Sequence, residues 1–294
     1  MKILLLLLLI VLLGGGARQH AIYASARRNA AQDHQSALYG SETFHLIVFL
    51  RTAEDTDEAA LDALRKLGAS AGEALDWVYA GRVAANGGHS PQLGDVKWTA
   101  VALFQAPSRA DAEAALEGPL GEAIAGVAQS HVHGFDRPVL SNLALPQMLG
   151  VRRLVALLRR EPSNFPFARR EGELTMPQAQ DLAAQMLRGE RLNTEAAVVF
   201  NLSSPGTAEQ REKDAAYTGR MLASMAEGGY GPIHRGRAVR VQGDADFANV
   251  VIVYYPGVRF FADMIQSDFF QGIIGDKQLG DNQSTITVPV LDRL

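Results

Sequence analysis

An unbroken apolar run opens the chain. Met1 and Lys2 precede the apolar residues Ile3–Leu13, and the small residues Gly14–Ala17 follow. A short basic start, a short apolar stretch and a small-x-small exit are typical of a secretory signal peptide. Eleven helical residues rise about 16 Å, which is roughly half of a bilayer's hydrocarbon core. We therefore expect residues 1–26 to be the signal peptide of an exported, periplasmic or secreted protein. The alternative is an uncleaved membrane anchor.

Behind a polar tether at 27–43, two stretches show the same order of apolar patterns. In residues 44–140, the apolar run Phe44–Leu50 is typical of a buried strand, and Asp57–Ser70 has helical spacing. Residues 195–294 repeat the order strand, helix, strand, strand, helix, strand. This order predicts an α+β fold of two tandem ferredoxin-like units. Each unit has one apolar sheet face to cover, so we expect the two sheets to pack face to face as an intrachain pseudo-dimer.

The units are joined by a helical linker at 141–194, which is too long for a plain loop. Within it, Met148–Arg160 predicts an amphipathic helix with four arginines on one arc: Arg152, Arg153, Arg159 and Arg160. Such a helix can lie on an anionic membrane, so membrane proximity through this helix or the leader is one hypothesis. The interpretation that we favour is a packing helix with solvated arginines.

Charge and composition narrow the classes of partner. The chain has 28 Lys and Arg against 32 Asp and Glu, a net charge of −4, which gives no case for binding nucleic acid. It has no cysteine, which excludes disulfides, thiolate metal sites and a cysteine nucleophile. The absence of thiols suits an oxidising compartment. A homodimer is compatible with these features but is not required by them.

The C-terminal half carries the motifs of a resemblance. Val250–Gly272 runs from a strand through Tyr255-Pro256 into a helix that ends at Asp268-Phe269-Phe270-Gln271, and Arg191-Leu192-Asn193 leads into Val198–Leu202. Over about 176–291 the chain resembles the domain-of-unknown-function family 1330 of the dimeric α/β-barrel superfamily. The first half is similar by pattern alone. The resemblance implies paired ferredoxin-like sheets forming a barrel, and it supplies no catalytic set.

Candidate binding residues lie where two strands of the second unit meet its helices. His234 and Arg235 enter one strand and could orient an anionic or oxygenated ligand. Tyr254 and Tyr255 end the next strand, and alternation points one ring to each face of the sheet. We predict that these four residues line a small-molecule site between the two sheets. A solvent-facing or core role is the simpler alternative for each of them.

His131 and His133 are a weaker pair of metal candidates. Strand alternation points both imidazoles to one face, a geometry that can hold a metal or a haem. A third ligand would have to come from His89 or Asp136, and no spacing supports either. No cofactor is therefore assigned.

Two classes of function stay open. The absence of a paired acid–base or nucleophile set favours an exported small-molecule-binding or scaffold protein. The alternative, which the superfamily implies, is a monooxygenase- or isomerase-like enzyme acting on a small organic substrate, with a haem link among its relatives.

Overall fold

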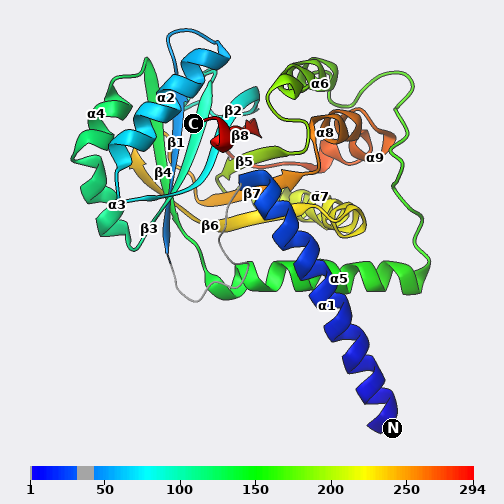
Figure 1. The fold of residues 1–294 in the computed structure, drawn as a ribbon. Coiled ribbons are helices and arrows are strands. Elements are labelled where there is room, and N and C mark those ends of the chain that lie inside the picture. Colours follow the sequence, from blue (N-terminus) through cyan, green and yellow to red (C-terminus); the bar gives the residue numbers. More distant parts are fainter. Residues whose placement is uncertain (1, 32–42) are drawn as a thin grey trace.

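Eight strands form one closed antiparallel barrel, and helices surround it (Figure 1). The structure, a computed structural model, describes residues 2–31 and 43–294. The strands are β1 (Phe44–Arg51), β2 (Asp76–His89), β3 (Ala100–Ala106), β4 (Gln129–Asp136), β5 (Ala197–Ser203), β6 (Gly231–Gln242), β7 (Asn249–Tyr255) and β8 (Asn282–Pro289). The helices are α1 (Lys2–Ala31), α2 (Asp57–Ala71), α3 (Arg109–Leu116), α4 (Pro119–Ala125), α5 (Val139–Arg159), α6 (Ala179–Arg188), α7 (Ala208–Gly228), α8 (Val258–Ile265) and α9 (Asp268–Gln271).

Around the barrel the strand order is β1-β3-β2-β8-β5-β7-β6-β4, and β4 returns to β1. Each half of the chain contributes four neighbouring strands in the expected element order. The halves are nevertheless not separate units, because β2 pairs with β8 and β4 pairs with β6 along their lengths. The expectation of tandem ferredoxin-like units packed as an intrachain pseudo-dimer is therefore wrong. The description of the chain as a tandem repeat is wrong for the same reason.

The physical reason for this correction lies in how the apolar faces are covered. Two flat sheets would have covered each other face to face while leaving four strand edges unpaired. Here the sheet curves until its edges meet, so that every strand has two hydrogen-bonded neighbours and the inner face encloses its own core. Phe49 of β1 and Phe200 of β5, from opposite halves, meet edge to face inside the barrel with ring centroids 6.3 Å apart.

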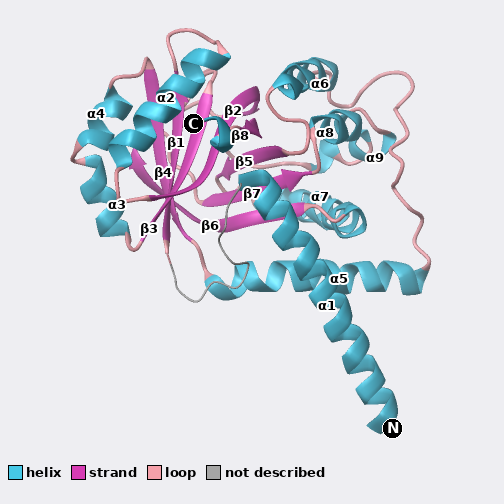
Figure 2. Ribbon diagram, viewed as in Figure 1, coloured by secondary structure: helices cyan, strands magenta, loops and turns pink. Residues whose placement is uncertain are grey.

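The outer face is covered by two groups of helices (Figures 1 and 2). Helices α2, α3 and α4 cover the first half, where the alternate residues Leu46, Val48 and Leu50 of β1 point outward and are fully buried. Helices α6 to α9 lie together over β5, β7 and β8. Their ends carry ordinary capping signals, such as the capping box of Thr207 and Gln210 at the start of α7.

Helix α1 has two parts. Its first part, Ile3–Leu13, is exposed, whereas Gln19, Tyr23, Ala26 and Ala30 in its second part are buried against the body. The helix runs without a break past residue 26 into the segment expected as a tether, whose remaining residues 32–42 lie outside the described residues. Ile3–Ala30 is the one described helix that is long and apolar enough to cross a membrane, although a signal sequence has the same properties. Such a helix suits either export or membrane anchoring.

Candidate functional site

A cavity of about 290 Å³ lies outside the barrel, between the outer face of β5, β7 and β8 and the helices α6 to α9. Its floor is the outward-facing residues of the three strands: Val199, Asn201, Val251, Val253, Tyr255, Ser284 and Ile286. Binding pockets for small ligands are commonly about 300–1,000 Å³, so this cavity matches a small, compact molecule.

The deep end of the cavity is apolar and adaptable. Phe261, Met264 and Phe270 from α8 and α9 close it on one side, and Met221 and Met225 from α7 close it on the other. Counting Met176, four of the chain's seven methionines line this one cavity. Methionine side chains are flexible and polarisable, so the lining can adjust around flat aromatic ligands of different outline.

The outer end of the cavity carries the ionisable groups. Asp214 and Tyr217 come from successive turns of α7, and Lys277 comes from the loop before β8. All three side chains are partly buried, and none makes a hydrogen bond or ion pair with another described residue. Fully buried polar groups usually have a protein or water partner, whereas these three side chains remain partly exposed. Their donors and acceptors are therefore available to a ligand in the apolar cavity.

Burial shifts the pKa values of these groups in the directions that weaken their charges. Burial lowers the pKa of Lys277 below its usual value, and the carboxylate of Asp214 opposes that shift. Burial likewise raises the pKa of Asp214, and Lys277 opposes it. Burial also raises the pKa of Tyr217, with a further push from Asp214. A lysine with a lowered pKa supplies a neutral amine at lower pH than a solvated lysine does.

The position of Lys277 is fixed by its neighbours in the chain. Asp276 forms an ion pair with Arg220, one turn of α7 beyond Tyr217. The backbone N–H of Lys277 donates to the carbonyl of Ile274 at 3.1 Å. Loop and helix are thus held together at the mouth of the cavity.

The four residues expected to form one site are divided by the barrel wall. Tyr255 points outward into the cavity, and its ring meets Phe261 edge to face with centroids 4.8 Å apart. Tyr254 lies on the inner face of β7, where it is the cross-strand partner of the inward-facing Val198. His234 also points into the barrel, and Arg235 is exposed. The two tyrosines point to opposite faces of β7, as predicted. The described strands form one closed barrel, so these four residues do not lie together between two separate sheets.

Four histidines line the inside of the barrel instead. His131 and His133 of β4 lie with ring centroids 4.6 Å apart, and His45 and His234 lie 5.3 Å apart. At most 1% of each residue's surface is exposed, and each ring has at least one nitrogen with no hydrogen-bond partner in the described part of the chain. Aromatic rings surround them: Phe135 stacks on His45 at 5.0 Å, and Phe247 contacts His133 at 5.4 Å.

This environment keeps the imidazoles neutral. Burial lowers the pKa of His45 to about 3, and Arg137 and Arg27 add to the effect. Burial also lowers the pKa of His131 to about 4, where Asp244 opposes the shift and Arg240 adds to it. Burial and the neighbouring His131 lower the pKa of His133 to about 3. The pKa of His234 falls well below its usual value for the same reason, burial, with Arg27, Arg137 and His45 adding to it.

The metal and haem hypotheses do not fit these positions. Among residues 2–31 and 43–294, no three metal-ligating side chains come together. His89 and Asp136, considered as third ligands, are both exposed at strand ends, while His131 and His133 face the interior. No described histidine lines the apolar cavity, so none of them presents an imidazole there to the plane of a haem.

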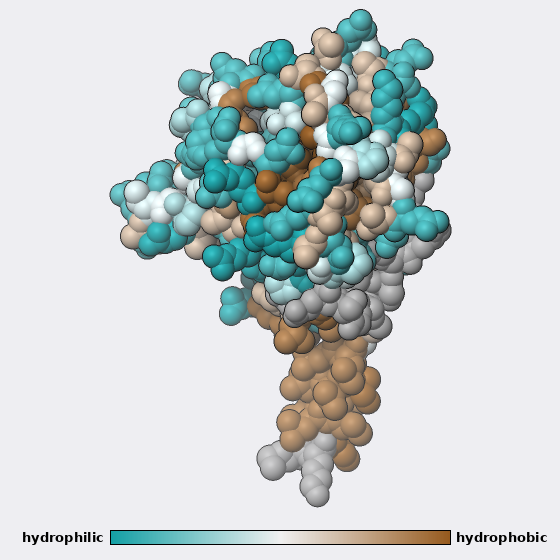
Figure 3. All heavy atoms as spheres, turned by 90° about the vertical axis from the view of Figure 1, so that its left-hand side faces the viewer, coloured by the Kyte–Doolittle hydropathy of each residue, from teal (hydrophilic) through white to brown (hydrophobic). Residues whose placement is uncertain are grey.

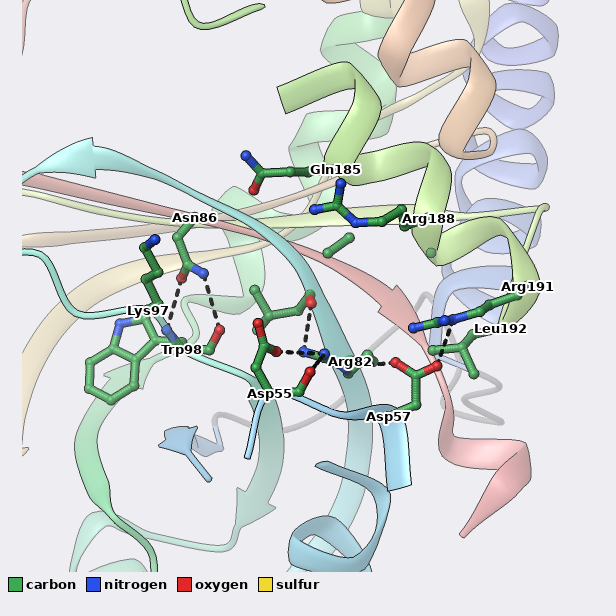
Figure 4. Close-up of a pocket in the computed structure, with 13 residues that line it drawn as sticks. Asp55, Asp57, Arg82, Asn86, Lys97, Trp98, Gln185, Arg188, Arg191 and Leu192 are labelled. Atoms are coloured by element: carbon green, nitrogen blue, oxygen red, sulfur yellow. Dashed lines mark hydrogen bonds and ion pairs between the residues drawn. The ribbon is translucent and has the colours of Figure 1, made fainter. Parts of the chain in front are cut away.

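A second, polar cleft of about 400 Å³ lies where β2 meets the end of α6 (Figure 4). Most of its charged groups satisfy one another. Arg82 donates to Asp55 at 2.7 Å and to Asp57 at 3.1 Å, and Arg191 forms an ion pair with Asp57 at 2.7 Å. Arg82 also donates to the backbone carbonyls of Val83 and Thr99. We regard this cleft as a structural tie between β2, α2 and the end of α6, because its buried arginine has no donor left for a ligand.

The residues at the mouth of the apolar cavity were not anticipated from the sequence. Tyr217, Met221 and Met225 recur at helical spacing in the sequence, and this spacing was part of the available signal. Asp214 extends the same stripe by one turn, so a carboxylate interrupts an otherwise apolar helix face. Lys277 lies 63 positions further along the chain in a loop, and no spacing links it to α7.

No protein-family model and no curated protein matches the chain. Among solved structures it is similar to a candidate monooxygenase from Fusobacterium nucleatum, at 8% identity and a TM-score of 0.42, covering 86% of this chain and 94% of that one. It is also similar to a candidate monooxygenase from Lactobacillus acidophilus, at 8% identity and a TM-score of 0.38, covering 85% of this chain and 94% of that one. A third similar structure is that of an anthrone oxidase-like protein, at 13% identity and a TM-score of 0.42, covering 87% of this chain and 94% of that one. Identities and TM-scores this low carry no argument about function, so the function is argued from the residues of the cavity.

Proposed function

We propose that the protein is a monooxygenase-like enzyme that acts on a small aromatic substrate held in the cavity between α7, α8 and the outer face of β5, β7 and β8. One observation carries the proposal: three ionisable residues that have no hydrogen-bond or ion-pair partner among the described residues, Asp214, Tyr217 and Lys277, stand at the mouth of an otherwise apolar cavity. An inert carrier would need apolar contact and one hydrogen bond. A lysine with a lowered pKa adds the means to remove a proton.

The lining defines the substrate class. The methionine and phenylalanine side chains at the deep end favour a flat, apolar ring system. The hydroxyl of Tyr217 and the amine of Lys277 favour a carbonyl or phenol oxygen at the outer end. The proposed substrates are those ring systems in which a methylene group is conjugated with the carbonyl, because its C–H bonds are acidic.

The proposed step uses Lys277 as the base. Its neutral amine takes a proton from the activated C–H of a substrate R₂CH₂, which leaves a carbanion stabilised by the ring system and by hydrogen bonding to its oxygen. The carbanion reduces molecular oxygen and forms a C–O bond, giving a hydroperoxide after the lysine returns its proton. Loss of water then yields the ketone, so that R₂CH₂ and O₂ become R₂C=O and H₂O.

Anthrone is a suitable probe, because it is a flat three-ring ketone with one acidic methylene group. Oxygen uptake by the purified full chain with anthrone should exceed the rate without protein, with anthraquinone formed in equal amount. Lys277→Met keeps the length of the side chain and removes the amine, so it should lose most of this rate while still binding the probe. Lys97→Met, in the polar cleft, is the matched control and should retain the rate.

Equilibrium dialysis with the same probe separates the remaining outcomes. Binding without oxygen uptake would replace the enzyme by a binding protein that uses the same cavity. If the probe does not bind, or if Lys277→Met is as active as the unmodified chain, the proposed function is wrong.

A further inference from the structure

The helix α5 crosses α1 at the side of the body from which the first part of α1 emerges (Figure 1). The crossing is close because it is built on glycines. A Cβ on Gly150 of α5 would lie 3.2 Å from the backbone oxygen of Gly15 and 3.1 Å from the Cβ of Gln19. A Cβ on Gly16 would lie 3.2 Å from the side chain of Gln147. The two helices therefore form a fixed pair.

An apolar stripe runs along the outer side of α5. It recurs at helical spacing and consists of Leu140, Ala144, Met148, Val151, Val155 and Leu158, here named the α5 stripe. Leu140 is 80% exposed and Leu158 is 75% exposed, whereas Leu145 and Leu149 on the opposite side of the helix are 5% and 2% exposed. The helix packs through its other side and presents this stripe outward.

The exposed part of α1 is apolar on all sides. Every residue from Ile3 to Leu13 is between 38% and 76% exposed, and Figure 3 shows this segment projecting from a largely hydrophilic body. A protein partner would cover one side of such a helix and leave the rest in water. A helix that is apolar all round requires a medium that surrounds it, such as a lipid bilayer.

Basic side chains border the α5 stripe and the crossing. Arg18 is exposed at the point where α1 reaches α5, and Arg159 and Arg160 are exposed at the end of α5. Neither Arg159 nor Arg160 forms an ion pair with a described residue. Arg152 lies beside the stripe and is held by Glu161 at 2.6 Å. An exposed apolar stripe with free arginines at its border is the composition of a helix that lies in the interface of an anionic membrane.

We propose that α1 and the α5 stripe form one membrane-binding surface, in which Ile3–Leu13 inserts into an anionic bilayer and α5 lies flat in its interfacial region. The occupant is inferred from continuity, because the α5 stripe borders the emerging apolar helix, and from charge, because the free groups at its border are guanidinium groups. Membrane attachment would then fix the orientation of the body, since two crossing helices rather than one hold it.

The experiment uses the full chain, which has no cysteine and so accepts a single label. Val151→Cys and Leu158→Cys place a thiol-reactive fluorophore on the α5 stripe, and Leu187→Cys on α6 is the matched control at an exposed leucine. Each labelled protein is reconstituted into vesicles of phosphatidylcholine and phosphatidylglycerol that carry brominated acyl chains, which quench only fluorophores within the bilayer. The proposal expects the labels at 151 and 158 to lose at least half of their fluorescence and the label at 187 to keep it.

The charge contribution is tested in the same assay. Arg18→Gln combined with Arg159→Gln should remove most of the quenching of the label at 151, because fewer cations meet the lipid phosphates. The matched pair Arg109→Gln and Arg211→Gln, both exposed elsewhere on the body, should leave it unchanged. Vesicles of phosphatidylcholine alone should give weaker quenching than the anionic vesicles.

Two results would overturn the proposal. Equal quenching at 151, 158 and 187 would mean that the body associates with lipid without a defined face. Labels on the stripe that are shielded from aqueous iodide but not quenched by brominated lipid would mean that a second copy covers the stripe, and disulfide cross-linking of Val151→Cys would then identify that copy.

Discussion

Tyr79 of β2 and Thr287 of β8 share a hydrogen bond of 2.6 Å inside the barrel, and they belong to opposite halves of the chain. The Thr287 hydroxyl donates to the carbonyl of Val198 at 2.9 Å, so the tyrosine hydroxyl is the donor to the threonine. Both side chains are buried at the β2–β8 pairing that joins the halves. The pair therefore reports on whether the halves are stable independently.

Tyr79→Phe should lower the free energy of unfolding by about 1–2 kcal/mol, because a buried acceptor loses its donor. Urea denaturation followed by circular dichroism measures this change. Tyr217→Phe is the matched control: that hydroxyl has no partner among the described residues, so its loss should cost less than about 0.5 kcal/mol. The transition should remain single, and two separate transitions would contradict a shared barrel.

The interior histidines predict acid sensitivity. Their folded-state pKa values, about 3 for His45 and His133 and about 4 for His131, lie below the ordinary value of 6.5. Below pH 6.5 the unfolded chain binds protons that the folded chain does not, so stability falls as pH falls towards 4. The loss is at most about 1.4 kcal/mol per pH unit for each histidine.

This prediction is checked by urea denaturation between pH 7.5 and 4.5. His133→Leu should reduce the dependence of stability on pH by about one proton. The exposed His89→Leu is the control variant. Equal slopes for both variants would contradict the role assigned to the buried ring.

A glycine next to the histidine pair is expected to resist substitution. Gly243 has a φ of 107°, and a Cβ there would lie 2.2 Å from Nδ1 of His131. Gly243→Ala combines backbone strain with a clash against a buried ring and should cost about 3 kcal/mol. Gly219→Ala, within α7 and with nothing near its Cβ, should instead stabilise the protein by up to about 1 kcal/mol. Thermal unfolding of the two variants gives the comparison, and similar melting temperatures would contradict it.

The pH dependence of oxygen uptake tests the electrostatic influence of Asp214 on the pKa of Lys277. The base must be neutral to act, so the rate should rise with pH through the pKa of Lys277. Asp214 raises that pKa, and Asp214→Asn should therefore move the rise to lower pH. Glu209→Gln changes a more distant carboxylate of α7 and should not move the profile. A shift towards higher pH in Asp214→Asn would contradict the assignment of Lys277 as the base.

Local structure was predictable where periodicity is strong. His131 and His133 share one face of their strand, and Tyr254 and Tyr255 point to opposite faces of theirs. Both arrangements follow from strand geometry and appear in the structure. Closure of the barrel was not predictable in the same way. The pairings of β2 with β8 and of β4 with β6 join strands far apart in sequence, and alternation fixes which face a residue occupies but not which strand lies beside it.

The candidate site was only partly predictable for a related reason. Tyr255 was expected to bind a ligand and does line the cavity, whereas His234 and Tyr254 lie behind the barrel wall. Lys277 joins Asp214 and Tyr217 only because the loop before β8 folds back onto α7. Contacts of this kind depend on tertiary packing, which a single sequence does not encode in its spacing.

The pairing of β8 with β2 also constrains how the protein is made. β8 begins 193 positions after β2 ends, so the edge of β2 stays unpaired until that long stretch of chain has been synthesised. The open edge of β4 is covered earlier, when β6 is complete. A nascent chain that carries an open apolar sheet is prone to aggregate. Deletion of the last strand should therefore yield insoluble protein rather than a smaller soluble domain, and chaperones that shield strand edges should raise the yield of the full chain.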